Sequence, residues 1–351
     1  MKGGENVGYS ANAIMAKSRA LYGKRLTEAN YNDLVNCKSI GELVSYLKAK
    51  TAYAAEFESA NADITPFQVE ELLKMHILSS FEKISRYEAS AGVEFYKYFI
   101  MKNDIQQLLR YLNYLIIGKP GDYLSVLPPF FNKRSELDLY KLAAARSFDE
   151  MLEAIKGTPY FKALEPFKQI YSLPESYLKM ECALDRELWE TEKNIVSKFS
   201  GRSKDKIIEI ISYENDMENL VRIYRLKRLA DADKDTIKDY LNLNFTHFTQ
   251  KNIEDMLEKP TARKMLEEAT GSYYKKCFKN PEFTLLEDYT HRVLYDKFKK
   301  EIRYSTQPVA VMICYFYLAQ NEVNNIIRIV EGIRYSMAPE AIIGALIGAQ
   351  D

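Results

Sequence analysis

The chain has 351 residues, enough for two or three domains of about 150 residues each. Its 49 basic and 49 acidic residues leave no formal charge, which argues against nucleic-acid binding and polybasic lipid anchoring, since both need an excess of Lys and Arg. Glycine and proline number only 14 and 11, fewer than a chain of many short strands needs for its turns. Helices are therefore expected.

The first part of the chain contains the starts of two predicted helices. Ser39-Ile40-Gly-Glu42-Leu43 is typical of a cap followed by an amphipathic helix. Thr65, Pro66 and Gln68 form a capping-box pattern with proline in the first turn. Residues 67–88 then keep apolar side chains at helical spacing, and another helix is predicted around residues 102–110.

All three features recur twice along the chain. The cap pattern returns at Ser147 and Asn252, and the proline returns at Pro174 and Pro281. The pattern Asn, acid, apolar, any, Asn or Gln, apolar, apolar, Arg occurs in 102–110, 214–222 and 320–328. Landmarks that recur in the same order predict three diverged copies of a unit of about 107 residues.

We therefore predict an all-α fold of three similar helical-bundle domains, spanning 1–119, 120–231 and 232–351. Each copy should contain one or two short helices and then two long helices of about 25 residues, or ~35 Å. The stretch Leu127-Pro128-Pro129 and residues 229–234 lie near the joins. The period is too long for solenoid repeats of the TPR, HEAT or ankyrin kind.

Motifs that carry chemistry are missing from the sequence. It contains no G-x-x-x-x-G-K-[ST] phosphate loop, no G-x-G-x-x-G turn, no H-E-x-x-H pair and no G-x-S-x-G elbow. We expect His76 to pack between helices, and the four scattered cysteines to be reduced thiols, not disulfides or zinc ligands. No catalytic, cofactor-binding or metal-binding residue is therefore predicted.

Targeting and membrane signals are missing as well. The first six residues lack the apolar core and cleavage site of a signal peptide. The longest apolar run, residues 309–319, is far shorter than the roughly 20 residues that cross a bilayer. We expect a soluble, cytosolic protein without a membrane span of its own.

A polar stripe is the most distinctive feature of the third predicted helix in each copy. Its members lie at i, i+4 and i+7, opposite an apolar face that we expect to be core. We name as polar stripe residues Asn103, Gln107, Arg110, Asn215, Asn219, Arg222, Asn321, Asn325 and Arg328. The stripe is either structural, bridging a neighbouring helix, or a lining presented to a partner.

Three segments point to a known family. Ala16-Lys17-Ser18-Arg19-Ala20-Leu21 is similar to an A-R-x-R-A-[LM] element, with Lys17 in place of its first Arg. Residues 34–43, with Tyr46-Leu47 and Thr51-Ala-Tyr53, resemble a Y-x-x-L-x-x-C/A … L … T-x-Y element. Residues 320–332 resemble E-x-x-N-[IL]-R-x-[IL]-x-x-G, with Asn321 before the acid. Together they resemble the C-type subunit of the V/A-type ATPases, whose equivalent in the eukaryotic vacuolar enzyme is the d-type subunit.

The resemblance implies three helical domains around a pseudo-threefold axis, forming a funnel on the cytoplasmic side of the membrane rotor ring. Such a protein is non-catalytic and binds no cofactor, nucleic acid or small-molecule substrate. Its partners are the central shaft, made of D- and F-type subunits, and the proteolipid c-ring that carries H⁺ or Na⁺. One copy per complex and a monomer in isolation are implied. The polar stripe residues are then candidate contacts to the shaft or the ring.

Two other classes of function remain open at this stage. A general helical scaffold or adaptor would share the all-α fold but would need no threefold closure. A small-molecule enzyme with an unrecognised site would show a concave pocket with clustered, perturbed titratable groups. The sequence does not indicate the transported ion, nor whether the complex works as a pump or as a synthase.

Overall fold

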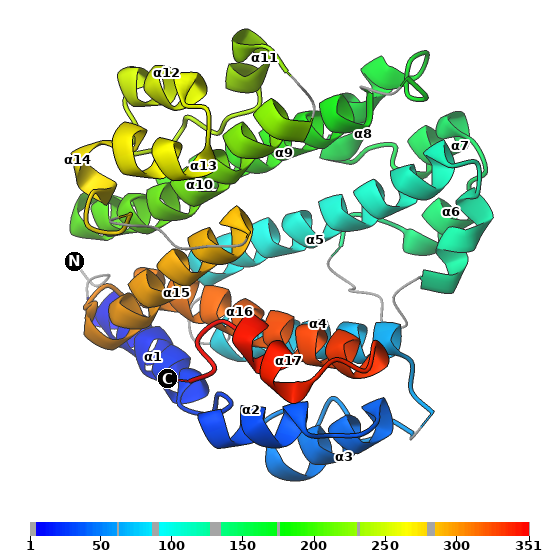
Figure 1. Ribbon diagram of the computed structural model, residues 1–351, viewed down its shortest axis with the longest axis vertical. Helices are drawn as coiled ribbons and strands as arrows, with labels where there is room; N and C mark the ends of the chain where they lie inside the picture. Colours follow the sequence, from blue (N-terminus) through cyan, green and yellow to red (C-terminus); the bar gives the residue numbers. More distant parts are fainter. Residues whose placement is uncertain are drawn as a thin grey trace. The chain divides into compact units, whose positions relative to one another are not determined.

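The computed structural model describes residues 5–61, 63–85, 91–126, 135–173, 176–229, 232–278 and 285–350 (Figure 1). Every regular element among them is a helix, which confirms the all-α prediction. The elements are α1 (Glu5–Tyr22), α2 (Glu28–Val35), α3 (Ile40–Lys50), α4 (Pro66–Ser85), α5 (Ala91–Ile116), η1 (Pro120–Val126), α6 (Leu139–Ala144), α7 (Phe148–Ala154), α8 (Pro159–Leu164), η2 (Glu165–Phe167), α9 (Ser176–Ser197), α10 (Gly201–Leu229), α11 (Lys234–Asp239), α12 (Gln250–Glu258), α13 (Ala262–Lys264), η3 (Met265–Ala269), α14 (Gly271–Tyr274), α15 (Leu286–Tyr304), α16 (Pro308–Arg334) and α17 (Pro339–Ala345).

The predicted helix starts are largely confirmed. Ser39 and Ser147 are the N-caps of α3 and α7, and each side chain accepts a hydrogen bond from the backbone N–H three residues later. Pro66 is the first residue of α4, and the predicted capping box with Gln68 is formed. The predicted prolines at 128, 129, 174 and 281 lie outside the described residues.

The prediction that Asn252 caps a helix is wrong. Helix α12 begins at Gln250, and its N-cap is Thr249, whose hydroxyl accepts from the backbone N–H of Asn252. The Asn252 side chain in turn accepts from the backbone N–H of Thr249, at 3.0 Å. Asn252 is thus the third helical residue of a capping box, which moves the helix start upstream.

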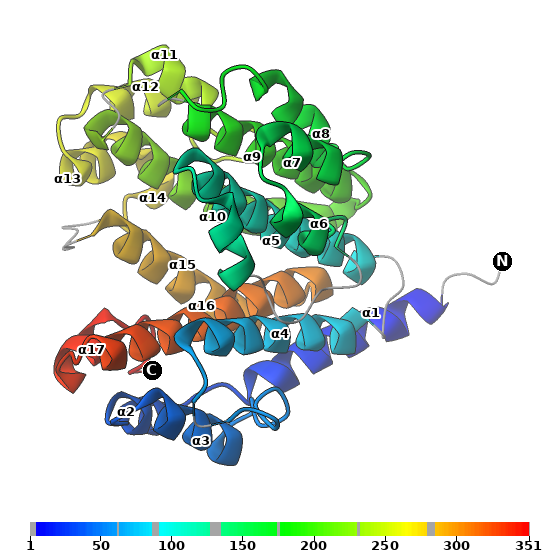
Figure 2. The same ribbon diagram turned by 90° about the vertical axis from the view of Figure 1, so that its right-hand side faces the viewer.

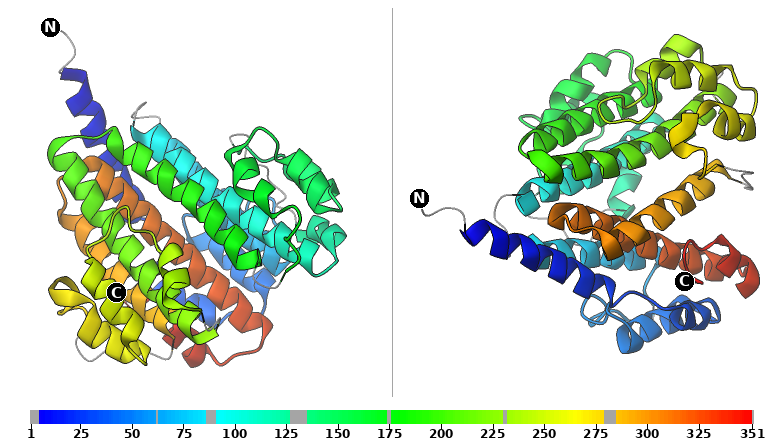
Figure 3. Two further views of the ribbon diagram at one scale, coloured as in Figure 1. Left: turned by 90° about the horizontal axis from the view of Figure 1, so that it is seen from above. Right: turned by 90° about the vertical axis from the view of Figure 1, so that its left-hand side faces the viewer.

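The chain divides into two compact units, one of residues 88–198 and one of residues 1–87 with 199–351. In the first unit, α5 packs against α9, and the short helices α6–α8 gather at one end of this pair (Figure 3, left). Leu108 and Leu112 of α5 are fully buried there, together with Met151 and Leu164. The predicted division at 119/120 and 231/232 stays a prediction.

Helix α16 forms the centre of the other unit. It lies against α1, α4 and α15, and Figure 2 shows α1 and α4 running beside it. Its residues Val309 to Phe316 are all buried, as expected of a helix that is apolar on every side. Gly332 lets α17 approach, because a Cβ at that position would lie 2.6 Å from the Ile342 side chain.

The arginine of the N-terminal sequence element ties α1 to the end of α15. Arg19 donates from Nε to the Ile302 carbonyl oxygen at 2.8 Å and from a terminal nitrogen to the Ser305 carbonyl oxygen at 2.7 Å. These carbonyls at the end of α15 lack partners within the helix. A guanidinium therefore caps this helix from a segment almost 300 positions away.

Among the described residues, no helix combines the length and the apolar character needed to cross a bilayer.

Helices α5 and α16 end in the same way. Gly118 and Ser336 follow them with φ of 75° and 53°, and the next residue donates back to the carbonyl of Tyr114 or Gly332, at 2.9 Å in both cases. This is the Schellman ending, which glycine favours because L side chains resist positive φ. Ser336 therefore carries backbone strain that Gly118 does not.

Ser336→Gly should raise the free energy of unfolding by about 0.5–1 kcal/mol, since it relieves this strain without removing a contact. The midpoint of urea unfolding is the measurement. The reciprocal change Gly118→Ser, at a site where a new Cβ meets nothing within 4 Å, should destabilise by a similar amount. An unchanged midpoint for both variants would show that the left-handed conformation has no cost here.

Candidate functional site

Most polar stripe residues are inside the protein. Gln107, Asn215, Asn219, Asn321 and Asn325 are buried, with 1–8% of their surface exposed. The other four, Asn103, Arg110, Arg222 and Arg328, are half-buried. The expectation that the stripe contacts a shaft or a ring stays a prediction. The positions of these side chains favour the other alternative, that they tie parts of the same chain together.

On α10 the stripe holds the segment that follows α11. The Asn219 side chain donates to the Asn242 carbonyl oxygen at 2.8 Å and accepts from the Asn242 N–H at 3.0 Å. Asn215 donates to the Phe245 carbonyl oxygen at 3.3 Å, and Arg222 donates to the Tyr240 carbonyl oxygen at 3.2 Å. The stripe thus satisfies backbone groups of an irregular segment that would otherwise be buried without partners.

On α16 the stripe holds the C-terminal segment in a similar way. Asn321 and Asn325 both donate to the Ile347 carbonyl oxygen, at 3.0 and 2.8 Å, and Asn325 also accepts from the Ile347 N–H at 3.0 Å. Arg328 donates to the Ala345 carbonyl oxygen and pairs with Asp288 at 2.6 Å. On α5, Gln107 accepts from the Tyr123 hydroxyl at 3.2 Å.

The acidic residue of the repeated pattern has a partner that sequence reasoning missed. Asp104, Asp216 and Glu322 each accept a hydrogen bond from a tyrosine hydroxyl and one from a backbone N–H. The tyrosines are Tyr160 at 3.1 Å, Tyr274 at 2.7 Å and Tyr53 at 2.8 Å, and the N–H groups belong to Glu136, His247 and Leu26. We call these pairs the acid–tyrosine anchors.

A sequence signal for these tyrosines exists. Each lies two residues after a hydroxyl residue, in Thr51-Ala-Tyr53, Thr158-Pro-Tyr160 and Ser272-Tyr-Tyr274. Each predicted copy contains the motif, although the first copy contains it a second time, at Ser85-Arg-Tyr87, so the motif narrows the choice of tyrosine without fixing it. The repeated anchors relate the three predicted copies through side-chain contacts as well as through sequence.

Burial of Asp104 has a consequence for pH dependence. Although Ser135, Tyr160 and a backbone N–H donate to this carboxylate, burial dominates and raises its pKa to about 6. A folded-state pKa above the unfolded value of about 3.9 means that the folded chain binds the proton more tightly. Its contribution to stability is complete below pH ~4 and is lost as the pH rises through 6.

The stability of the native chain relative to Asp104→Asn should therefore be about 1–1.5 kcal/mol greater at pH 5 than at pH 7. Urea unfolding of both proteins at the two pH values measures this difference, and groups that titrate elsewhere cancel in the comparison. A difference that does not change with pH, or that grows toward pH 7, would contradict a raised pKa for Asp104.

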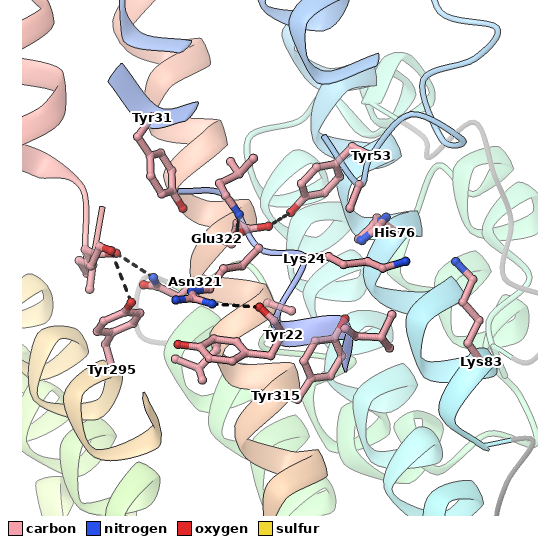
Figure 4. A pocket seen from close by; sticks show the side chains of 18 residues that line it. Tyr22, Lys24, Tyr31, Tyr53, His76, Lys83, Tyr295, Tyr315, Asn321 and Glu322 are labelled. Carbon is pink, nitrogen blue, oxygen red and sulfur yellow. Dashed lines mark hydrogen bonds between the residues drawn. The ribbon is translucent and has the colours of Figure 1, made fainter. Parts of the chain in front are cut away.

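A cavity of about 160 Å³ adjoins the third anchor (Figure 4). Glu322 forms part of its wall and is occupied at both oxygens, by the Leu26 N–H at 2.7 Å and the Tyr53 hydroxyl at 2.8 Å. Burial raises the pKa of this carboxyl group above its usual value. Besides aliphatic residues, the wall contains basic and aromatic side chains, including Lys24, Arg25, Tyr31, His76, Lys83, Tyr295 and Tyr315.

Two of the three histidines lie beside carboxylates. His76 Nδ1 lies 3.0 Å from Glu56 Oε2, and its ring packs on Tyr53 with centroids 4.4 Å apart, which agrees with the expected packing role. His247 Nδ1 lies 2.9 Å from Asp216 Oδ2. Within the described part of the chain, no three His, Cys, Asp or Glu side chains form a group that could hold a metal ion.

The chain is similar to known proteins over almost its whole length. A family model described as "ATP synthase (C/AC39) subunit" matches residues 14–344. The C-type subunit of the A-type ATP synthase of Methanocaldococcus jannaschii is 24% identical over 345 residues, which cover 95% of this chain and 85% of that protein. The proteins of the same name from Thermococcus kodakarensis and Methanothermobacter thermautotrophicus are 19% and 22% identical, covering 93% and 95% of this chain and 87% and 86% of theirs.

Proposed function

Because the chain belongs to the ATP synthase (C/AC39) subunit family, we propose that it is the non-catalytic central-stalk subunit of a rotary V/A-type ATPase. In this role it is a socket that links the central shaft, made of D- and F-type subunits, to the proteolipid c-ring. It transmits torque for H⁺ or Na⁺ transport. The observation that carries the proposal is the family match over residues 14–344.

The internal ties of the fold support a mechanical role. A protein under torque must resist sliding of one helix along another. Between α10 and α15, Lys206 and Lys297 each pair with both Glu209 and Glu301, at 2.6–3.0 Å. These four side chains are at most one-third exposed, so solvent screens the network less than it screens a surface pair. Sliding of α10 along α15 would have to break the contacts that cross between the two helices.

The repeated anchors support a threefold construction. We propose that the three copies, 1–119, 120–231 and 232–351, are related by a pseudo-threefold axis and form a funnel. Each copy supplies one acid and one tyrosine, and each acid–tyrosine anchor joins the acid of one copy to the tyrosine of another. Internal closure of three copies would leave the isolated chain a monomer, with one copy in each complex on the cytoplasmic side of the ring.

Binding to both partners is the direct test. The full chain is mixed with purified D- and F-type shaft subunits and with detergent-solubilised c-ring, and the mixtures are separated by size-exclusion chromatography with light scattering. We expect one copy of the chain in a complex with each partner and in a joint complex with both. A general helical scaffold would join neither.

Because the sequence lacks a phosphate loop, we also expect no ATP hydrolysis by the chain alone.

A further inference from the structure

The cavity beside Glu322 has an unbalanced charge. Lys24, Arg25 and Lys83 line it, and none of them pairs with a carboxylate in the described part of the chain. Arg25 donates to the Tyr22 carbonyl oxygen, at 3.4 Å, and lies over the Tyr22 ring. Lys74, on the same helix as Lys83, differs from these three cations because it pairs with Glu70 at 2.7 Å and with Glu71 at 3.3 Å.

The one carboxylate of the wall, Glu322, offsets at most one of these three positive charges. Both oxygens of Glu322 already accept hydrogen bonds, from Leu26 and Tyr53. His76 faces the cavity as well, but its Nδ1 is directed to Glu56. The cavity is thus bordered by three cationic side chains and one carboxylate whose hydrogen-bonding positions are largely used.

The cations come from different parts of the fold but converge. Lys24 and Arg25 lie in the turn after α1, whereas Lys83 lies on α4, two turns beyond His76 on the same side of that helix. Figure 4 shows the amino groups of Lys24 and Lys83 pointing toward one another beside the His76 ring. An anion between them would contact both ammonium groups, each of which has three donors to offer.

We propose that this cavity binds a compact oxyanion of the phosphate class. Its volume of about 160 Å³ is close to that of a protein cavity known to accept benzene, ~150 Å³, and a phosphate ion is of comparable size. Pockets for drug-sized ligands are larger, roughly 300–1,000 Å³, so the volume favours a compact anion over a whole nucleotide. Ammonium and guanidinium groups together are the usual partners of phosphate oxygens. This inference does not depend on the proposed rotor role.

Titration with inorganic phosphate tests the proposal. The full chain is titrated in a calorimeter at fixed pH, with NaCl adjusted to keep the ionic strength constant. We expect saturable binding of one phosphate per chain, weakened at least tenfold by the double change Lys24→Gln with Lys83→Gln. A matched control, Lys141→Gln with Lys193→Gln, removes two exposed lysines from the other compact unit and should leave the affinity within twofold.

A second variant gives an effect of opposite sign. Glu322→Gln removes the one carboxylate among the described residues of the cavity wall and should strengthen phosphate binding, provided that circular dichroism shows a folded chain. Heats that do not saturate, or equal phosphate affinity in the native chain and the Lys24/Lys83 double variant, would overturn the proposal. Tighter binding of ATP than of phosphate would overturn it too, because the site would then be a nucleotide site.

Discussion

Asp216→Ala is expected to lower the free energy of unfolding by about 3–5 kcal/mol. The Asp216 carboxylate has no exposed surface and accepts from the Thr246 hydroxyl, the Tyr274 hydroxyl and the His247 N–H. Alanine would remove the acceptor of all three donors, of which Tyr274 is fully buried and the other two half-buried, and each buried donor left unsatisfied costs about 1–3 kcal/mol. Urea unfolding followed by circular dichroism measures the effect.

Asp216→Asn provides the graded comparison, because its amide oxygen can still accept one or two of these hydrogen bonds. It should be clearly more stable than Asp216→Ala. Asp205→Ala, at an exposed position of the same helix, is the control and should change the free energy of unfolding by less than about 1 kcal/mol. If Asp216→Ala were no worse than this control, the acid–tyrosine anchor would not stabilise the fold.

Asn325→Ala should cost about 2–4 kcal/mol. The Asn325 side chain is 1% exposed and makes two hydrogen bonds with the backbone of Ile347, and its amide nitrogen lies 3.3 Å from the Tyr31 hydroxyl. The neighbouring Asn324 is exposed, and among the described residues its side chain bonds only to Gln320, so Asn324→Ala should stay within about 0.5 kcal/mol. Thermal and urea unfolding of the two variants give the comparison.

This pair also decides between the two interpretations of the polar stripe. A structural stripe predicts that Asn325→Ala destabilises the chain, and that binding to the shaft or the ring changes only as far as folding does. A partner surface predicts the reverse pattern, with near-native stability and weakened binding. Equal stability of the Asn324 and Asn325 variants would therefore contradict the structural interpretation that the buried hydrogen bonds support.

Local patterns explain which parts of the fold were predictable. The caps at Ser39 and Ser147 and the capping box of Thr65 with Gln68 act within one turn, so the sequence around them is enough to locate the helix starts. At Asn252 two cap residues compete, and Thr249 takes the position because its hydroxyl and the Asn252 amide can satisfy each other. The apolar face opposite the stripe was also predictable, since Ile105, Leu108 and Leu112 follow helical spacing.

The candidate site was harder to predict because its contacts join distant segments. Tyr53 and Glu322 are 269 positions apart, and no local sequence pattern indicates that their side chains are in contact. The amide partners of the stripe are backbone groups of irregular segments, such as Ile347, which have no residue type that identifies them. The cavity likewise depends on Lys24 and Lys83 being brought together by the packing of α1 and α4.

Coupling of ATP hydrolysis to ion movement tests the central claim most directly. Complexes of head, shaft and membrane sector are assembled in lipid vesicles without the chain, and ATP hydrolysis and ion uptake are measured before and after the purified chain is added back. If the chain links shaft and ring, hydrolysis without it should proceed with no ion gradient, and adding the chain should restore the gradient. A gradient of the same size in its absence would contradict the proposed function.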